Sequence, residues 1–216
     1  NLSPEGDHHW KNGRDFYASN IVPMTVWASY LLDDIAGLRN NVPIMVDGNP
    51  ESIALAQDTD VIVGMAGPSN PEGATWGEGH NFGVTVDANP DEAKAFVLYV
   101  MNEEYVTWLG MAPEGSFPIR PGPTAGSNVF IEDWGNLLFG VDRKVPINSV
   151  YSQEIIEGLI NGLSVGTRWG AKEGQLPLAA KLVNSNLLNR LMMEYINGDR
   201  SAEETVNLLN SEASKL

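Results

Sequence analysis

Cysteine is absent from this chain of 216 residues. Disulfides, thiolate metal sites and cysteine nucleophiles are therefore excluded. No apolar run reaches the roughly 18 residues that a membrane-spanning helix requires. The chain also lacks a phosphate-binding loop of the G-x-x-x-x-G-K-[ST] type and a strand-linked G-x-G-x-x-G. We therefore expect no nucleotide and no other cofactor.

Positive charge is scarce: Lys and Arg number 13 against 28 Asp and Glu, which gives a formal net charge of −15. A chain this acidic repels phosphate backbones, so nucleic acid is not expected as a partner. Neutral ligands and cations remain possible, and anions are disfavoured. The histidine pair His8 and His9 is adjacent in sequence, so the two side chains diverge, and we expect no metal site.

Apolar residues make up 43% of the chain, enough for one large core or two small ones. Gly and Pro cluster at residues 64–79 and 110–126, which we interpret as the two natural breaks. Strands and helices alternate along the sequence, and this order favours an α/β fold with parallel pairing. Strands are predicted at 21–27, 61–63 and 82–86, and helices at 28–36, from Asn49, and at 89–110, 153–163, 178–196 and from Ser201.

Two helix starts are well marked. Asn89 can cap a helix whose first position is Pro90, and Glu92 then completes a capping box. Ser201 and Glu204 form a second capping box before the last helix.

Four blocks, at residues 23–30, 73–84, 89–120 and 197–206, carry a family resemblance. They combine a strand meeting a helix, a Gly-rich stretch with an aromatic, a capped helix followed by Pro-Ile-Arg, and a closing capped helix. In this order they resemble the maltose-binding type of extracellular solute-binding protein, the sugar-binding family of ABC importers. Residues 130–170 have no clear counterpart in that pattern.

The resemblance implies a two-lobe, type II periplasmic-binding-protein-like fold. Residues 1–88 and 118–216 would then form the carboxy-terminal lobe, and 89–117 would pack on an amino-terminal lobe that mostly precedes Asn1. The expected function is that of a non-enzymatic, extracytoplasmic solute binder whose partners are a sugar and the membrane subunits of an ABC transporter. Without the first lobe, the helix at 89–110 would expose apolar surface or promote self-association.

Aromatic rings beside turns are the candidate ligand contacts, because sugars stack their C–H faces on rings and hydrogen-bond through their hydroxyls. Trp76 lies between Thr75 and Gly77, where no ring is needed to fill a core. Tyr30 falls in the block that resembles the family's cleft. The predicted ligand-binding set is Trp76, Tyr30, Glu78, Gly77, Trp27, Arg168 and Trp169.

Other interpretations stay open at this point. Polyamine or another cationic solute is the main alternative ligand, since negative charge attracts it. A carbohydrate-active hydrolase is the alternative class, although no catalytic residue is predicted. Trp27 and Tyr30 could equally be core residues, and Glu78 a solvated loop acid. The paired acids Asp33 and Asp34 are expected to meet water on a helix face.

Overall fold

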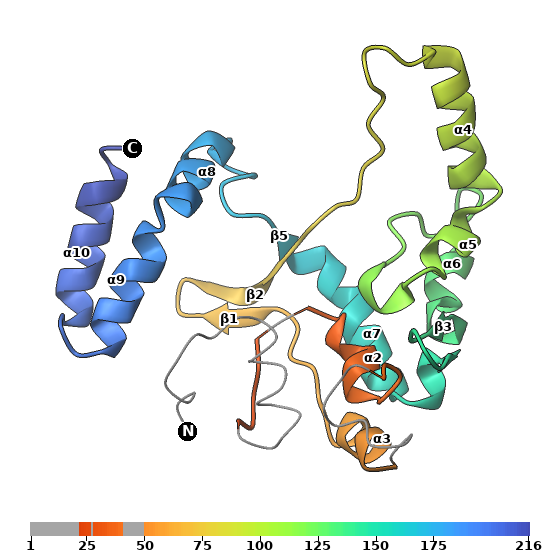
Figure 1. The fold of residues 1–216 in the computed structure, drawn as a ribbon, viewed down its shortest axis with the longest axis horizontal. Helices are drawn as coiled ribbons and strands as arrows, with labels where there is room; N and C mark the ends of the chain where they lie inside the picture. Colours follow the sequence, from red (N-terminus) through yellow and green to blue (C-terminus); the bar gives the residue numbers. More distant parts are fainter. Residues whose placement is uncertain (1–21, 27, 41–49) are drawn as a thin grey trace. The chain divides into compact units, whose positions relative to one another are not determined.

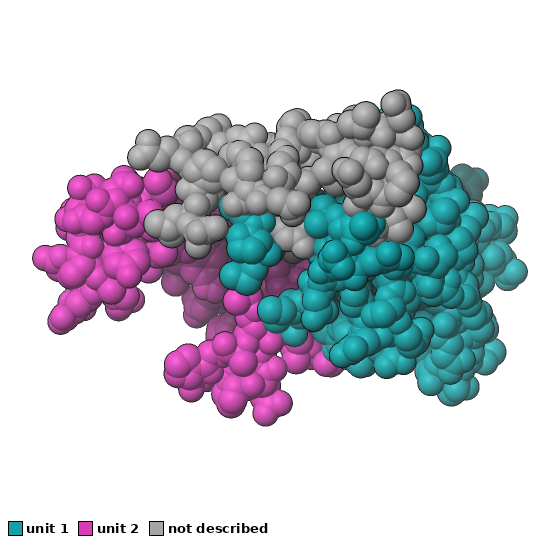
Figure 2. All heavy atoms as spheres, turned by 90° about the horizontal axis from the view of Figure 1, so that it is seen from below, with its two compact units in different colours: residues 1–63, 80–162 teal, residues 64–79, 163–216 magenta. Residues whose placement is uncertain are grey.

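The computed structural model describes residues 22–26, 28–40 and 50–216, and it contains helices together with two small sheets (Figure 1). The expected mixed α/β class is therefore confirmed at this level. The chain forms two compact units, and each combines two separate stretches of sequence (Figure 2). Unit 1 contains residues 1–63 and 80–162, and unit 2 contains residues 64–79 and 163–216. Within the described residues, no helix is both long enough and apolar enough to cross a membrane.

Unit 1 is mostly helical. Its only sheet within the described residues is an antiparallel hairpin, β3–β4, which pairs Leu138 with Pro146 and Phe139 with Val145. Short helices surround this hairpin and connect it to the longer α4 and α7. The elements of unit 1 are α2 (Leu31–Ile35), α3 (Pro50–Gln57), α4 (Pro90–Asn102), α5 (Tyr105–Leu109), η1 (Pro113–Gly115), α6 (Val129–Glu132), η2 (Trp134–Asn136), β3 (Leu138–Phe139), β4 (Val145–Pro146), η3 (Ile147–Ser149) and α7 (Gln153–Gly162).

The core of unit 1 is built around large side chains. Trp134, Phe139 and Ile147 are fully buried there. The indole N–H of Trp134 donates to the Ser116 carbonyl at 3.1 Å, and its ring stacks on Phe117 with centroids 4.9 Å apart. Trp134, which stands beside a turn signal in the sequence, is therefore a core residue with its one polar atom satisfied.

Unit 2 combines a three-stranded sheet with a helical hairpin and a further helix. Strands β1 (Met65–Gly67) and β2 (Asn70–Trp76) form an antiparallel pair, and β2 also pairs in parallel with β5 (Gly166–Thr167). The remaining elements are η4 (Leu163–Val165), α8 (Leu176–Ser185), α9 (Leu187–Ile196) and α10 (Ala202–Ala213). Helices α9 and α10 lie side by side in Figure 1.

The buried core of unit 2 is small. It consists of Leu182, Leu187 and Leu191, and the partly buried Leu178, Leu208, Leu209 and Ala213 pack against these. The predicted helix at 178–196 is wrong as a single element, because it divides into α8 and α9 at Asn186. Asn186 has φ = 53°, a left-handed conformation that asparagine tolerates better than most residues. The break lets the apolar residues of α8 and α9 pack against each other.

Both marked helix starts are confirmed, with one correction. The Asn89 side chain accepts from the backbone N–H groups of Asp91 and Glu92, so it caps α4. Among the bonds of the described residues, the reciprocal bond from Glu92 is not formed, so this cap is not a complete box. At α10, Ser201 and Glu204 form the full reciprocal box.

The predicted strands are not formed where the described residues cover them. Residues 22–26, 61–63 and 82–86 adopt no strand, and the strands of unit 2 lie inside the Gly- and Pro-rich stretch at 64–79 instead. Val84 is 50% exposed and Val86 is 97% exposed, so the alternating pattern at 82–86 has no partner strand to pack on. The Gly and Pro residues of 64–79 belong to a hairpin rather than to a linker.

Helix α4 buries none of its residues within the described part of the chain. Phe96 and Leu98 are each 60% exposed, and Tyr99 is 53% exposed. The expected exposed apolar surface on this helix is therefore present. Docking of α4 on another lobe, and self-association through it, remain predictions.

Candidate functional site

The carboxyl ends of β2 and β5 meet at one edge of the unit 2 sheet. The two strands are parallel, with Thr75 opposite Gly166 and Trp76 opposite Thr167. Ligands of open α/β sheets bind beyond the carboxyl ends of parallel strands, where the loops that follow the strands converge. The loop residues that follow this pair are Gly77 and Glu78 on one strand, and Arg168 and Trp169 on the other.

Gly77 holds the two strand ends together. Its backbone N–H donates to the Thr167 carbonyl at 2.7 Å, which continues the pairing one residue beyond β2. A Cβ added at Gly77 would lie 3.2 Å from both the Gly166 carbonyl carbon and the Thr167 nitrogen. A side chain there would push the strands apart, so the structure gives Gly77 a packing role. Glu78 follows it and is exposed.

Trp76 and Arg168 lie in contact at this edge. The central guanidinium carbon of Arg168 lies 5.7 Å from the centre of the Trp76 ring, within the range of a cation–π interaction. Trp76 is nevertheless 62% exposed, and Trp169, the next residue along, is 44% exposed. Three residues of the predicted ligand-binding set thus come from two distant stretches of sequence to one end of a strand pair.

A tightly bonded turn follows β5 and carries Arg168. The Ala171 N–H donates to the Arg168 carbonyl at 2.9 Å, and the Gln175 N–H donates to the Gly170 carbonyl at 2.6 Å. Gly170 has φ = 74°, and a Cβ there would lie 3.0 Å from the Gln175 carbonyl oxygen, so only glycine fits this position without strain. Backbone bonds therefore fix the point from which the Arg168 side chain extends.

This edge offers the two contacts that a sugar needs. An exposed indole presents a flat apolar face to the C–H groups of a pyranose ring. A guanidinium presents N–H donors and no acceptor, so it can bind ring oxygens and hydroxyl oxygens. Glu78, on the opposite loop, offers an acceptor for hydroxyl hydrogens. The geometry suits reversible binding of a polar ring.

Of the other two predicted ligand residues, the structure describes one. Trp27 lies outside the described residues. Tyr30 belongs to unit 1, immediately before α2, and is 42% exposed. Its ring lies against the α-carbon of Gly115, where an added Cβ would overlap the ring. Tyr30 is thus packed on η1 along one side of its ring.

Unit 1 contains a buried group of charges that the sequence interpretation misplaced. Asp33 is completely buried and Asp34 is 6% exposed, so the expectation that both meet water is wrong. Asp33 accepts from the Arg39 guanidinium at 2.6 Å, and Glu114, which is 1% exposed, lies 3.7 Å from the same group. The acids are embedded in the apolar run from Leu31 to Leu38, a signal that could have revealed their burial.

Two of these carboxyl groups, those of Asp33 and Glu114, have a raised pKa. Burial raises the pKa of Asp33 from 3.8 to about 6, and this outweighs the opposing effect of the hydrogen bond from Arg39. Burial likewise raises the pKa of Glu114, against the nearby positive charges of Arg39 and Lys144. One oxygen each of Asp33 and Glu114 lacks a hydrogen-bond partner. Within the described residues, no cluster of acids or histidines suits a metal ion.

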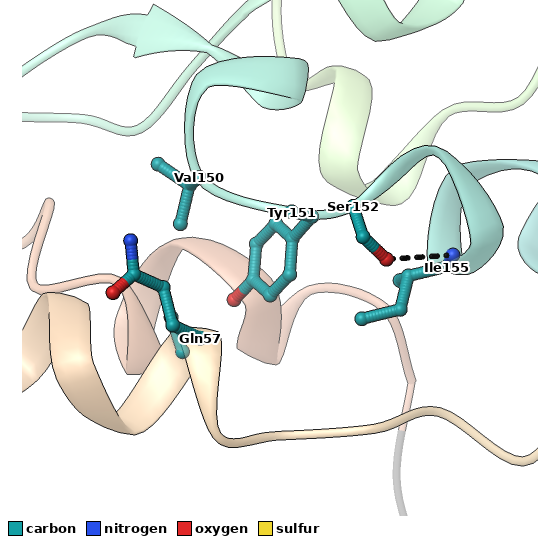
Figure 3. A pocket seen from close by; sticks show the side chains of 6 residues that line it. Gln57, Val150, Tyr151, Ser152 and Ile155 are labelled. Atoms are coloured by element: carbon teal, nitrogen blue, oxygen red, sulfur yellow. Dashed lines mark hydrogen bonds between the residues drawn. The ribbon is translucent and has the colours of Figure 1, made fainter.

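A pocket of about 290 Å³ opens in unit 1 between the end of α3 and the start of α7 (Figure 3). Its polar atoms are largely engaged in the fold. The Tyr151 hydroxyl donates to the Leu32 carbonyl at 2.6 Å, and the Ser152 hydroxyl accepts from the Ile155 N–H at 3.3 Å. The Gln57 side chain extends toward Val150 at one side of the opening (Figure 3). The pocket therefore offers a ligand few free polar groups, and the sequence gives no signal of it.

The sequence also contains a motif that is typical of serine hydrolases and was not predicted. Residues 162–166 read Gly-Leu-Ser-Val-Gly and match the G-x-S-x-G pattern of a serine nucleophile elbow. That elbow requires a strand, a sharp turn and then a helix. Here Ser164 lies on η4, which follows α7 and precedes β5, so the order of elements is reversed. The match carries no support for a hydrolase.

Comparison with known proteins adds no identification. No family model, curated protein or solved structure matches the chain. Since a fold by itself does not define a function, functional inference must come from the chemistry of specific residues. Of the arrangements described here, the strand edge with Trp76, Arg168 and Trp169 has side chains that are exposed and suited to a ligand.

Proposed function

We propose that the chain is the substrate-binding component of an ABC importer and that it captures a mono- or oligosaccharide. The observation that carries this proposal is the exposed Trp76 ring under the Arg168 guanidinium at the end of a parallel strand pair. Ring stacking together with fixed hydrogen-bond donors is the chemistry by which proteins recognise sugars.

The proposal includes a two-lobe architecture of the type II periplasmic-binding-protein-like kind, whose lobes close on a ligand by hinge bending. The sequence passes from unit 1 to unit 2 after Val63, returns after Gly79, and passes again after Gly162. These three crossings lie within residues 1–88 and 118–216, which the resemblance assigns to a single lobe, so the two units do not coincide with the two expected lobes. A closed, ligand-bound form would then be recognised by the membrane subunits of the transporter, outside the cytoplasm.

Binding without turnover is the expected behaviour. Stacking and hydrogen bonding at this edge require no nucleophile and no pair of opposed carboxylates. A polyamine is disfavoured at this edge, because the guanidinium of Arg168 would repel an ammonium group. We therefore expect the 216-residue chain to bind sugars reversibly and to leave oligosaccharides intact.

Isothermal titration calorimetry of the chain against glucose, maltose and maltotriose, with spermidine as the cationic comparison, tests the proposal. We expect saturable binding of at least one sugar. Trp76→Ala should weaken that binding by about 1–3 kcal/mol, since a stacking ring commonly contributes that much. Product analysis of the same mixtures after long incubation should show no cleavage.

Phe96→Ala is the matched control, because Phe96 on α4 is 60% exposed and Trp76 is 62% exposed. It should leave the dissociation constant unchanged. Equal weakening by both substitutions would remove Trp76 from the site. Binding of spermidine but of no sugar would refute the proposal.

A further inference from the structure

Arg168 differs from every other arginine in the described part of the chain. Its guanidinium forms neither a hydrogen bond nor an ion pair with any described residue, and its one recorded contact is the Trp76 ring. The remaining arginines there are each tied to protein oxygens. Arg39 pairs with Asp33, Arg120 binds the Asn102 side chain, Arg143 binds the Gly37 carbonyl, and Arg190 and Arg200 both pair with Glu194.

The Arg168 side chain is exposed, and the chain as a whole carries a net charge of −15. Acidic side chains outnumber basic ones by about two to one, yet no described carboxylate lies within 4 Å of the Arg168 guanidinium. No backbone carbonyl of the described residues accepts a hydrogen bond from it, whereas the Gly37 carbonyl does so from Arg143. An exposed cation with no described partner, beside an exposed ring, can contact a ligand that brings a negative charge.

We infer that the captured sugar carries a carboxylate, so that the ligand class is a hexuronate or an oligosaccharide containing one. This inference rests on the proposed function and specifies its substrate. A guanidinium is planar and presents paired N–H groups that match the two oxygens of a carboxylate, which gives a bidentate, charge-assisted contact. The Trp76 ring lies 5.7 Å from the central guanidinium carbon, and the N–H groups of Arg168 have no hydrogen-bond partner among the described residues.

The net charge of the chain does not oppose such a ligand at close range. At an ionic strength of 0.15 M, charges more than about 8 Å apart in water are largely screened, so the nearest charge dominates. At this edge Arg168 supplies the positive charge beside the Trp76 ring, and Glu78, on the opposite loop, supplies a negative one. Lys172 and Glu173, both exposed in the turn after β5, carry opposite charges that offset each other. A carboxylate in contact with the Arg168 guanidinium is therefore attracted at short range, whatever the net charge of the chain.

Calorimetric titration of the chain with galacturonate, galactose and acetate separates the contributions to binding. Galactose is the uncharged parent sugar, and acetate supplies the carboxylate alone. We expect galacturonate to bind more tightly than either, and its affinity to fall as sodium chloride is raised. In Arg168→Gln the affinity for galacturonate should fall roughly ten- to hundredfold, the effect expected for a lost hydrogen bond to a charged group. Arg168→Lys should restore only part of it.

Lys172→Gln is the matched control, because it removes the same charge from the same turn without touching the Trp76 ring. It should change the affinity for galacturonate by less than threefold. An equal loss of galacturonate affinity in both variants would show that only the net charge of the turn matters, and this would overturn the inference. Equal binding of galactose and galacturonate would also overturn it while leaving the proposed function intact. If neither sugar nor the maltose series binds, both proposals fail.

Discussion

Trp134 of unit 1 and the two tryptophans of unit 2 lie in opposite environments. In unit 1, Trp134 is fully buried, with its N–H bonded to Ser116 and its ring stacked on Phe117. In unit 2, Trp76 and Trp169 are exposed, and the buried core contains only three leucines. A fully buried ring therefore stabilises the core of unit 1, whereas both tryptophans of unit 2 stand on the surface. The same residue type beside a turn can serve packing or recognition, and burial decides which.

The largest expected effect is on the core of unit 1. Trp134→Ala should lower the free energy of unfolding by about 3–5 kcal/mol, because it removes a fully buried ring and leaves a cavity. Trp76→Ala should lower it by less than about 1 kcal/mol, the value of an exposed cation–π contact. Urea unfolding followed by circular dichroism measures both. Similar losses in the two variants would abolish the contrast between the units.

The next largest effect is expected in the small core of unit 2. Leu191 is fully buried against Leu182 and Leu187, so Leu191→Ala should cost about 2–3 kcal/mol. The cost should lie at the low end for leucine, because partly exposed neighbours can move into the space. Amide hydrogen exchange should then accelerate in α8, α9 and α10. Equal acceleration in α7 of unit 1 would show that the two units do not unfold separately.

The pH dependence should also differ between the units. In unit 1, the pKa of Asp33 is raised to about 6 by burial, so the folded state binds this proton more tightly than the unfolded chain does. The resulting destabilisation is fully present above pH 6 and disappears as the pH falls towards 4. Unit 1 should therefore gain stability over this range, by about 1–3 kcal/mol. Burial of Glu114 acts in the same direction.

In unit 2 the pH dependence of stability has the opposite sign. The hydrogen bond from Arg200 lowers the pKa of Glu194, and hydrogen bonds from Ser201 lower that of Glu204. The contribution of these two glutamates to stability is lost as the pH falls below the ordinary glutamate pKa.

The variant Asp33→Asn, which keeps an oxygen for Arg39, should flatten the dependence of unit 1 stability on pH between pH 4 and 7. Unfolding titrations that show an unchanged slope in this variant would exclude Asp33 as its source.

The smallest expected effect is at a helix start. Ser201→Ala removes half of the capping box of α10 and should cost about 1 kcal/mol. Ser214, at the other end of the same helix, donates its hydroxyl to the Asn210 carbonyl and is exposed. Ser214→Ala should therefore change the unfolding free energy by a few tenths of a kcal/mol at most. A larger loss of stability in Ser214→Ala than in Ser201→Ala would show that this cap does not stabilise unit 2.

Local signals in the sequence predicted local structure well. The starts of α4 and α10 follow from Asn89 and Ser201, because a cap depends on residues within one turn. The strands could not be predicted in this way. β2 depends on β5, far along the sequence, and the well-patterned stretch at 82–86 forms no strand because no partner lies beside it. The sequence of one segment alone does not show that it pairs with a distant segment.

The candidate site was predictable in part for the same reason. Trp76 and Trp169 were predicted as ligand contacts beside turns, and both are exposed, whereas Trp134, beside a similar turn signal, is buried. The contact between Trp76 and Arg168 depends on the parallel pairing and was not predicted. The burial of Asp33 and Glu114 was missed because acids at helical positions usually face water, and only the apolar residues around Asp33 indicate otherwise.

Because β2 pairs in parallel with β5, the strand edge cannot form during the early synthesis of the chain. Trp76 leaves the ribosome well before Arg168, and the whole of residues 80–162 must be made between them. Until β5 emerges, β2 has no neighbour on that side, and the Trp76 indole is open to nonspecific contacts. A nascent chain arrested before residue 163 would contain the ring but no binding edge.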